Sequence, residues 1–222
     1  MGVDVDELTE LYPVLYHMAA EGSWPSIRNH GLLSTSTLLD LFEIEGEERE
    51  NIEDRHRPEC MEIAHPELGK AIVRDQKPMS INGLKRALED DLTPRDWFRT
   101  LNAKVFFWVA RKRLETMMNA RAYKDMPKTV LEIETRGLLQ AHAPQVVLAP
   151  MNTGATHRFP WPRGKSTFQA LADYPFEDRR RRRLEPVVEL AVEGAVPDIA
   201  ELVLRVVEVR PGQGEETLWE RG

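Results

Sequence analysis

Three polar residues of the chain stand in or beside apolar runs that are typical of buried strands. His17 lies in V-L-Y-H-M, Glu189 lies in V-V-E-L-A-V, and Arg111 follows K-V-F-F-W-V-A. A buried histidine must pair its ring nitrogens, and a buried carboxylate is costly without a partner, so either side chain makes internal hydrogen bonds or faces a cleft. Arginine suits phosphate because its planar fork pairs bidentately with phosphate oxygens. The structural alternatives are a satisfied core histidine, a solvated glutamate and a surface arginine.

The opening segment predicts a strand, a short helix and a second extended piece around His17. Val14 to Met18 is the first strand, and Gly22 closes it. Ser23 occupies the expected N-cap of the helix, with a proline in the first turn. Gly31 stands where a left-handed residue ends a helix, and residues 32–36 continue as extended chain.

The rest of the chain predicts seven or eight short strands with few helices between them. Strands are expected at 104–110, which is the most apolar and therefore central, at 129–135 with one exposed face, and at 145–149, 186–192 and 202–209. Helices are expected at 4–12, 37–42, 81–88 and 93–101, and after Arg111. The helices are too sparse for strict β-α alternation, so we predict an α+β fold of two packed β-sheets with flanking helices.

Composition describes an ordinary globular protein of one domain. The 222 residues are 41% hydrophobic and 30% charged. The single cysteine, Cys60, fits a reducing compartment, and no apolar run approaches membrane-spanning length, so we expect a cytoplasmic protein without membrane contact. A net charge of −7 argues against a surface that coats nucleic acid, although the five arginines at 179–183 form a local basic patch.

The segments L-Y-H at 15–17 and W-P-S-I-R-N-H-G-L-L-S at 24–34 resemble the opening of ADP-ribosyltransferase-fold proteins. They look most like DarT-type DNA ADP-ribosyltransferases and a related uncharacterised bacterial family. The resemblance implies one ADP-ribosyltransferase-like domain over 1–222, with 43–101 as an insertion. The glycines and acidic residues after Pro211 indicate that 211–222 is a loose tail. The resemblance also implies that His17 lies along bound NAD, while Trp24, Gly31 and Leu32 frame the nicotinamide pocket.

Two later segments extend the resemblance. In V-F-F-W-V-A-R, Phe107 and Trp108 would wall the nicotinamide pocket, and Arg111 would reach the pyrophosphate or stabilise charge. In V-V-E-L-A-V, Glu189 matches the transferase's catalytic glutamate. The implied reaction cleaves the N-glycosidic bond of NAD through an oxocarbenium-like transition state, which a carboxylate near the ribose favours.

The acceptor is the least specified part of this interpretation. The polar loop beginning at Asn152 and the arginines Arg180, Arg181 and Arg182 are the candidate acceptor-binding residues, and a plain surface loop with a solvated basic face is the alternative. Aromatic and basic residues alternate over 157–183, which favours single-stranded DNA or RNA. No histidine or cysteine spacing predicts a metal site.

The leading functional hypothesis is therefore an NAD-dependent ADP-ribosyltransferase, acting on nucleic acid as a bacterial toxin or phage-defence effector with an antitoxin partner. The other hypothesis is a non-catalytic module that uses the same fold to bind a nucleotide or a protein.

Overall fold

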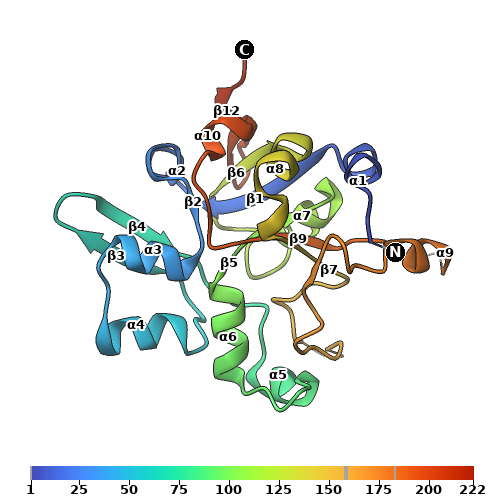
Figure 1. Cartoon of the computed structure of the whole chain (residues 1–222). Coiled ribbons are helices and arrows are strands. Elements are labelled where there is room, and N and C mark those ends of the chain that lie inside the picture. The colour runs from blue at the N-terminus through green and yellow to red at the C-terminus, as the bar shows by residue number, and fades with distance from the viewer. Residues whose placement is uncertain (1, 158–159, 183) are drawn as a thin grey trace.

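The computed structural model describes residues 2–157, 160–182 and 184–222, and an eight-stranded antiparallel sheet forms its centre (Figure 1). In spatial order the strands are β12 (Gly214–Glu220), β11 (Val203–Arg210), β6 (Lys128–Glu134), β1 (Val14–Ala20), β5 (Lys104–Trp108), β9 (Glu189–Glu193), β7 (Val146–Ala149) and β8 (Gln169–Ala170). Two small sheets pair β2 (Leu32–Leu33) with β10 (Ala195–Val196), and β3 (Met61–His65) with β4 (Gly69–Val73).

Short helices surround these sheets. They are α1 (Val5–Leu11), α2 (Trp24–His30), α3 (Thr35–Leu41), α4 (Gly46–Glu53), α5 (Ile81–Ala87), α6 (Pro94–Asn102), α7 (Arg111–Met118), α8 (Thr135–His142), α9 (Phe176–Arg181) and α10 (Ile199–Leu202), with a 3₁₀ turn at Ala143–Gln145. The predicted α+β class is confirmed. None of the helices in the described ranges has the length and apolar character needed to cross a membrane.

The large sheet is nearly divided between β1 and β5. These strands pair only through Tyr16 and Trp108, whereas β1 pairs with β6 along its whole length, as does β5 with β9. The expected two packed sheets are therefore two halves of one hydrogen-bonded sheet, joined at a single position. Beyond that position the two strands separate toward Ala20 and Lys104.

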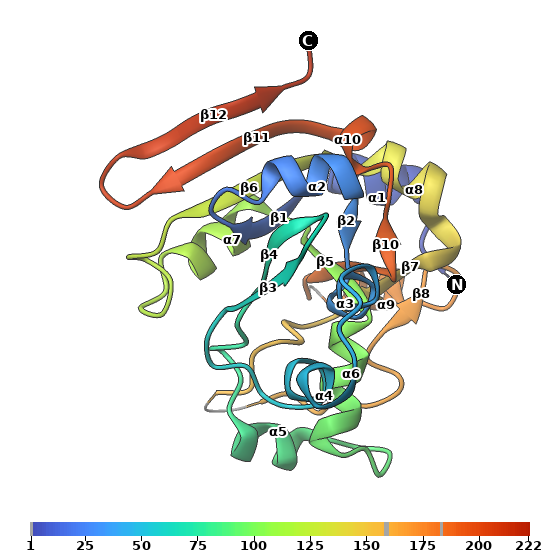
Figure 2. The same ribbon diagram turned by 90° about the vertical axis from the view of Figure 1, so that its left-hand side faces the viewer.

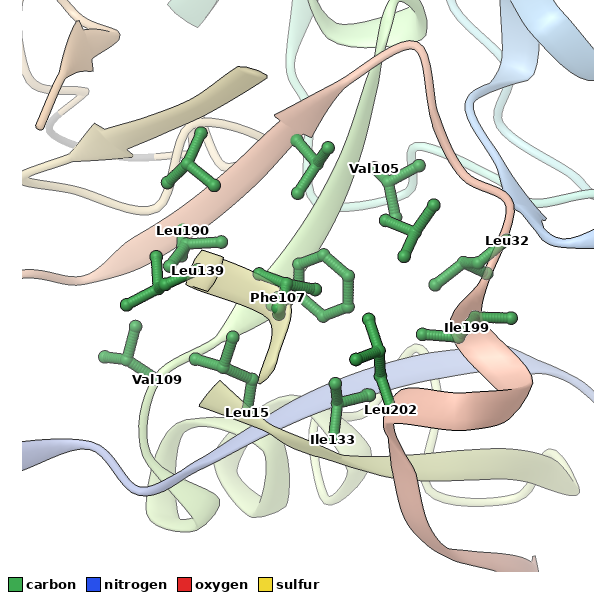
Figure 3. Packing of buried hydrophobic residues seen from close by; sticks show 14 of the residues in the cluster. Leu15, Leu32, Val105, Phe107, Val109, Ile133, Leu139, Leu190, Ile199 and Leu202 are labelled. Carbon is green, nitrogen blue, oxygen red and sulfur yellow. The ribbon is translucent and has the colours of Figure 1, made fainter. Parts of the chain in front are cut away.

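The main core is built by alternation along the central strands. Val105 and Phe107 of β5 point into it, and Phe107 lies among Leu15 of β1 and Leu190 of β9 (Figure 3). The next residue, Trp108, faces the other side, where α7 packs. The expectation that 104–110 is a central strand is confirmed, because two strands flank β5.

Two predicted segments differ from the structure. Strand β6 was expected to expose one face, but Val130 packs under α7 while Leu131 and Ile133 enter the main core, so both of its faces are covered. The tail 211–222 was expected to be loose, but Gly214–Glu220 forms β12 and pairs with β11 (Figure 2). Sequence alternation is silent there because nearly all β12 side chains are exposed.

Helix ends agree with the sequence in part. The helix expected from residue 93 has Thr93 as its N-cap, with a complete capping box to Asp96. Ser23 precedes α2 as predicted but makes no capping hydrogen bond. At the next helix, α3, the Ser34 hydroxyl caps the N-terminus by accepting from the Thr37 N–H. Gly31 ends α2 with φ +85°, as its position predicts.

Residues 43–101 supply α4, the β3–β4 hairpin, α5 and α6 (Figures 1 and 2). Whether they are an insertion stays a prediction. Their placement matters because the β3–β4 hairpin and the residues that follow it reach the site described next.

Candidate functional site

A cavity of about 500 Å³ opens where β1 and β5 separate. Its wall includes His17 to Ala20 of β1, Lys104 to Trp108 of β5, parts of α2 and of the β3–β4 hairpin, residues 152–154 after β7, and Glu189 of β9. The volume lies within the range of about 300–1,000 Å³ that is usual for small-molecule sites. Segments distant in sequence therefore meet at one place that could hold a ligand.

His17 faces this cavity as a neutral imidazole. Its Nδ1 lies 2.9 Å from the carbonyl oxygen of Phe106, and because a carbonyl only accepts, Nδ1 carries the hydrogen and donates. Burial lowers the pKa of His17 to about 4, with the Phe106 hydrogen bond opposing and the charge of Arg74 reinforcing that shift. Nε2 has no hydrogen-bond partner in the described chain, yet it is not sealed from solvent. The ring thus offers the cavity one hydrogen-bond acceptor.

Glu189 is 5% exposed and is held by one residue. Its Oε2 accepts from the Thr153 N–H at 3.1 Å and from the Thr153 hydroxyl at 2.6 Å. Burial raises the pKa of Glu189 to about 7, while these two hydrogen bonds and the charges of Arg113 and Arg163 pull it down. No described residue donates to Oε1, and that oxygen too remains accessible. At neutral pH the carboxyl is near the midpoint of its titration.

The loop that presents Thr153 is fixed from behind by Arg163. This side chain is 1% exposed and donates to the carbonyl oxygens of Thr153 at 2.7 Å and Ala155 at 3.0 Å. Its guanidinium also lies over the Trp97 ring. Arg163 was expected on a nucleic-acid surface, and the structure shows instead that it braces Thr153, the one described residue that donates to the Glu189 carboxylate.

Seven of the predicted site residues line the cavity. They are His17, Gly31, Leu32, Phe107, Trp108, Asn152 and Glu189. Phe107 contributes as a backing wall, because its ring is 1% exposed and meets the His17 ring edge-on at 5.9 Å. The Trp108 side chain packs beside Tyr16 and Met117.

Trp24 and Arg111 lie outside the cavity. Trp24 is buried in the main core and its ring packs on that of Trp219, so it holds α2 against β12. Arg111 forms ion pairs with Glu132 at 2.8 Å, Glu115 at 3.1 Å, and Glu215. The structure therefore does not bring Arg111 to the cavity where a pyrophosphate was expected, because these three carboxylates hold its guanidinium elsewhere.

The predicted acceptor arginines also lie away from the cavity. They belong to α9 and the turn after it, at the side of the molecule opposite the β3–β4 hairpin (Figure 1). Arg180 pairs with Glu7, Arg181 lies 3.9 Å from Asp178, and Arg182 is exposed. Arg158, Phe159 and Arg183 fall outside the described residues. Among the expected aromatics, Phe168 stacks on Trp97 whereas Trp161 is 71% exposed.

Sequence reasoning did not single out several polar residues of the cavity wall, among them Arg74, Asp75, Tyr123 and Thr153. Asp75 accepts from the Tyr123 hydroxyl at 2.6 Å, and the Arg74 guanidinium lies over the Tyr123 ring. Only Thr153 carried a signal, since it adjoins Asn152. Over the described ranges, His, Cys, Asp and Glu side chains form no group of three that could hold a metal ion.

The fold and site define an α+β protein with a small-molecule cavity beside a divided antiparallel sheet. A family model described as "Family of unknown function (DUF7002)" matches residues 13–203, and the chain belongs to this family. The match spans both His17 and Glu189 and ends at the start of β11. No curated protein matches the chain.

Proposed function

We propose that this protein is an NAD-dependent ADP-ribosyltransferase whose dinucleotide site is the cavity between β1 and β5. The observation that carries the proposal is that His17 and Glu189, which come from opposite ends of the chain, line one cavity. Each has an accessible acceptor atom with no hydrogen-bond partner among the described residues. A large sheet that divides beside the cavity supports the proposal, since the sequence resemblance implies a core of two packed sheets. An imidazole and a carboxylate are both suited to the hydroxyl groups of a ribose, which donate hydrogen bonds.

Within this proposal the chain's own residues have separate roles. His17 Nε2 accepts a hydrogen bond from a ribose hydroxyl and orients the sugar. Glu189 Oε1 accepts from the 2′-hydroxyl and, when ionised, stabilises the positive charge that develops at C1′ as nicotinamide leaves with the bonding electron pair. The acceptor's nucleophilic atom then bonds to C1′ and loses its proton, which Glu189 is placed to take. Phe107 backs the site and fixes the edge of the His17 ring.

The raised pKa of Glu189 suits these roles. A carboxyl that titrates near neutrality can be ionised for charge stabilisation and can also hold a proton taken from the acceptor. Perturbed carboxyls of this kind gather at active sites, although structural burial also produces them. The hydrogen bonds from Thr153 favour the ionised form and so keep part of the population reactive at pH 7.

The proposal is tested by incubating the protein with NAD labelled on the adenylate, together with single-stranded DNA, RNA or a protein extract. We expect release of nicotinamide and label on one acceptor class. Glu193→Gln is the matched control, since Glu193 ends the same strand but is exposed. NAD binding without nicotinamide release under any condition would favour the non-catalytic binding module.

Single-stranded nucleic acid is the acceptor class that we propose. Its support is the exposed set of Trp161, Lys165, Arg181 and Arg182, which can stack on bases and pair with phosphates. Changing Arg180, Arg181 and Arg182 to Ala should weaken binding of a labelled oligonucleotide in fluorescence anisotropy and flatten its salt dependence. Affinity that ignores both the substitutions and the salt concentration would favour a protein or small-molecule acceptor.

A further inference from the structure

Among the described residues, four cationic side chains line the cavity, and three of them already have partners. Arg57 is 4% exposed and donates to the carbonyl oxygens of Ile52 and Arg74 and to Asn102. Lys104 donates to the Thr100 carbonyl, and Lys70 pairs with Glu62 at 2.7 Å. Of these four described side chains, the fourth, Arg74, is therefore the one that an anionic group of a ligand can reach unpaired.

Arg74, the fourth, keeps most of its donors free. One terminal nitrogen donates to the Met18 carbonyl at 3.1 Å. The other approaches the Asp75 carboxylate only to 3.6 Å, which is longer than a hydrogen bond. Its Nε has no partner among the described residues, and no unpaired nitrogen of this group is sealed from solvent. With 24% of the side chain exposed, an arginine of five N–H donors has several to offer the cavity.

The neighbours of Arg74 hold it in place. The Tyr123 ring lies under the guanidinium at 5.4 Å, and the Tyr123 hydroxyl is tied to Asp75. The backbone is also held, because Arg57 Nε donates to the Arg74 carbonyl and the Gln76 N–H donates to the Arg57 carbonyl. A fork that is fixed before the ligand arrives loses little freedom on binding.

Position and charge define what Arg74 can bind. Its bond to the Met18 carbonyl places it beside His17, and the pKa of His17 responds to its charge. Asp75 offsets part of that charge, since its carboxylate lies 3.6 Å from one terminal nitrogen of Arg74. The Asp75 side chain is fully buried and already accepts from the Tyr123 hydroxyl, the Lys77 N–H and Cys60, so no hydrogen bond from Arg74 is needed to satisfy it. A planar fork next to a ribose-binding imidazole suits a phosphate attached to that ribose.

We propose that Arg74 is the phosphate-binding residue of the cavity and holds the diphosphate of the bound nucleotide. This inference rests on the proposed function for the identity of the ligand as NAD. It assigns to Arg74, which directly follows β4, the pyrophosphate-binding role that the sequence analysis gave to Arg111. The ligand class it requires is a nucleoside diphosphate or a dinucleotide.

Isothermal titration calorimetry tests this assignment with ADP, NAD and nicotinamide riboside, which has no phosphate. We expect Arg74→Gln to weaken ADP and NAD binding by roughly 10- to 100-fold, the loss typical of charge-assisted hydrogen bonds, without weakening nicotinamide riboside binding. Lys70→Gln is the matched control, because Lys70 lines the same cavity but is paired with Glu62, and it should change ADP affinity less than about threefold.

Arg74→Lys covers the case in which the Gln variant does not fold. It keeps the charge but loses the fork, so ADP binding should weaken while nicotinamide riboside binding does not. ADP affinity equal to that of the unmodified protein in this variant, or no binding of ADP and inorganic pyrophosphate by the unmodified protein, would overturn the assignment. ADP binding that depends on Arg74, with no nicotinamide release from NAD, would keep the assignment and refute the transferase.

Discussion

At the scale of residues, the site depends on a threonine that hydrogen-bonds only one of the two carboxylate oxygens of a glutamate. Thr153 directs both its N–H and its hydroxyl to Oε2 of Glu189 and leaves Oε1 to the cavity. The two hydrogen bonds only partly offset the cost of burying the carboxylate, so ionisation of Glu189 is less favourable in the folded protein than in water. The raised pKa of Glu189 affects both the stability of the fold and the pH dependence of the proposed reaction, and the two effects can be measured separately.

Glu189→Gln should stabilise the protein at alkaline pH. The folded-state pKa of Glu189 is about 7 and the unfolded value is 4.5, so the folded state holds the extra proton between these values and the stability that this residue contributes falls as the pH rises from 4.5 through 7. The neutral amide avoids that loss. We expect the variant's free energy of unfolding to exceed that of the unmodified protein by about 1–3 kcal/mol at pH 8 and by much less at pH 5.

Urea unfolding at the two pH values measures this difference, and Glu193→Gln serves as the exposed control. A difference of the same size at pH 5 and pH 8 would mean that the Glu189 carboxyl is not the group being titrated.

Thr153 should set the pH at which the proposed reaction switches on. Only ionised Glu189 stabilises positive charge, so nicotinamide release should rise with pH and reach half its maximum near pH 7. Thr153→Val removes the hydroxyl donor and raises the pKa of Glu189 further, which should move this midpoint upward, whereas Thr153→Ser should leave it in place. Identical profiles for all three proteins would show that Thr153 does not tune the carboxyl.

Sequence alone identifies some of these residues and not others, for a physical reason. His17 and Glu189 were found because a polar residue inside an apolar run is conspicuous. Arg111 was expected at the cavity and Arg74 was not considered, because the direction of a long side chain is fixed by partners from elsewhere. For Arg111 these are Glu132 and Glu215, and for Arg74 they are Met18 and Tyr123.

At the scale of elements, the turn from α2 to β2 makes one wall of the cavity and leaves no room for a side chain. Gly31 has φ +85°, and a Cβ there would lie 2.7 Å from the Cα of Pro197, beside the β2–β10 pairing. Gly22 has a similar φ of +73° at the other end of the segment, but a Cβ there would meet nothing within 4 Å. Substituting Gly22 therefore tests the cost of the backbone conformation alone, whereas substituting Gly31 tests that cost together with steric crowding.

Gly22→Ala should cost about 1–2 kcal/mol, the penalty of a left-handed alanine. Gly31→Ala should cost about 1–3 kcal/mol more, because the backbone of residue 197 must move as well. Thermal unfolding of both variants measures the difference. Equal losses would mean that the close approach to Pro197 is relieved at no cost.

Strand positions could be predicted better than strand environments. The apolar segments at 14–18, 104–110 and 202–209 were found because alternation and β-branched residues mark strands. The burial of the second face of β6 was not predicted, because it depends on the packing of α7 across that face. The single-position junction of β1 and β5 is likewise a property of pairing, and no local pattern encodes it.

At the scale of the whole molecule, the cavity is assembled from both ends of the chain and from its middle. The middle contributes the β3–β4 hairpin segment, whose irregular, charged sequence gave no hint of a site. The α+β class could be predicted because it needs only the count and order of elements. The sequence did not allow us to predict which segments lie next to one another, except that the family resemblance implied that His17 and Glu189 share a site.

The measurement that tests the central claim most directly compares NAD binding with NAD cleavage in Glu189→Gln. Calorimetry gives the affinity, and release of nicotinamide under single-turnover conditions gives the rate. Because the amide keeps the shape of the carboxylate but not its charge, we predict an affinity within about threefold of the unmodified protein and a rate lower by roughly 10²–10³-fold. An unchanged rate of nicotinamide release in this variant would contradict the account, since the charge of Glu189 would then have no part in the reaction.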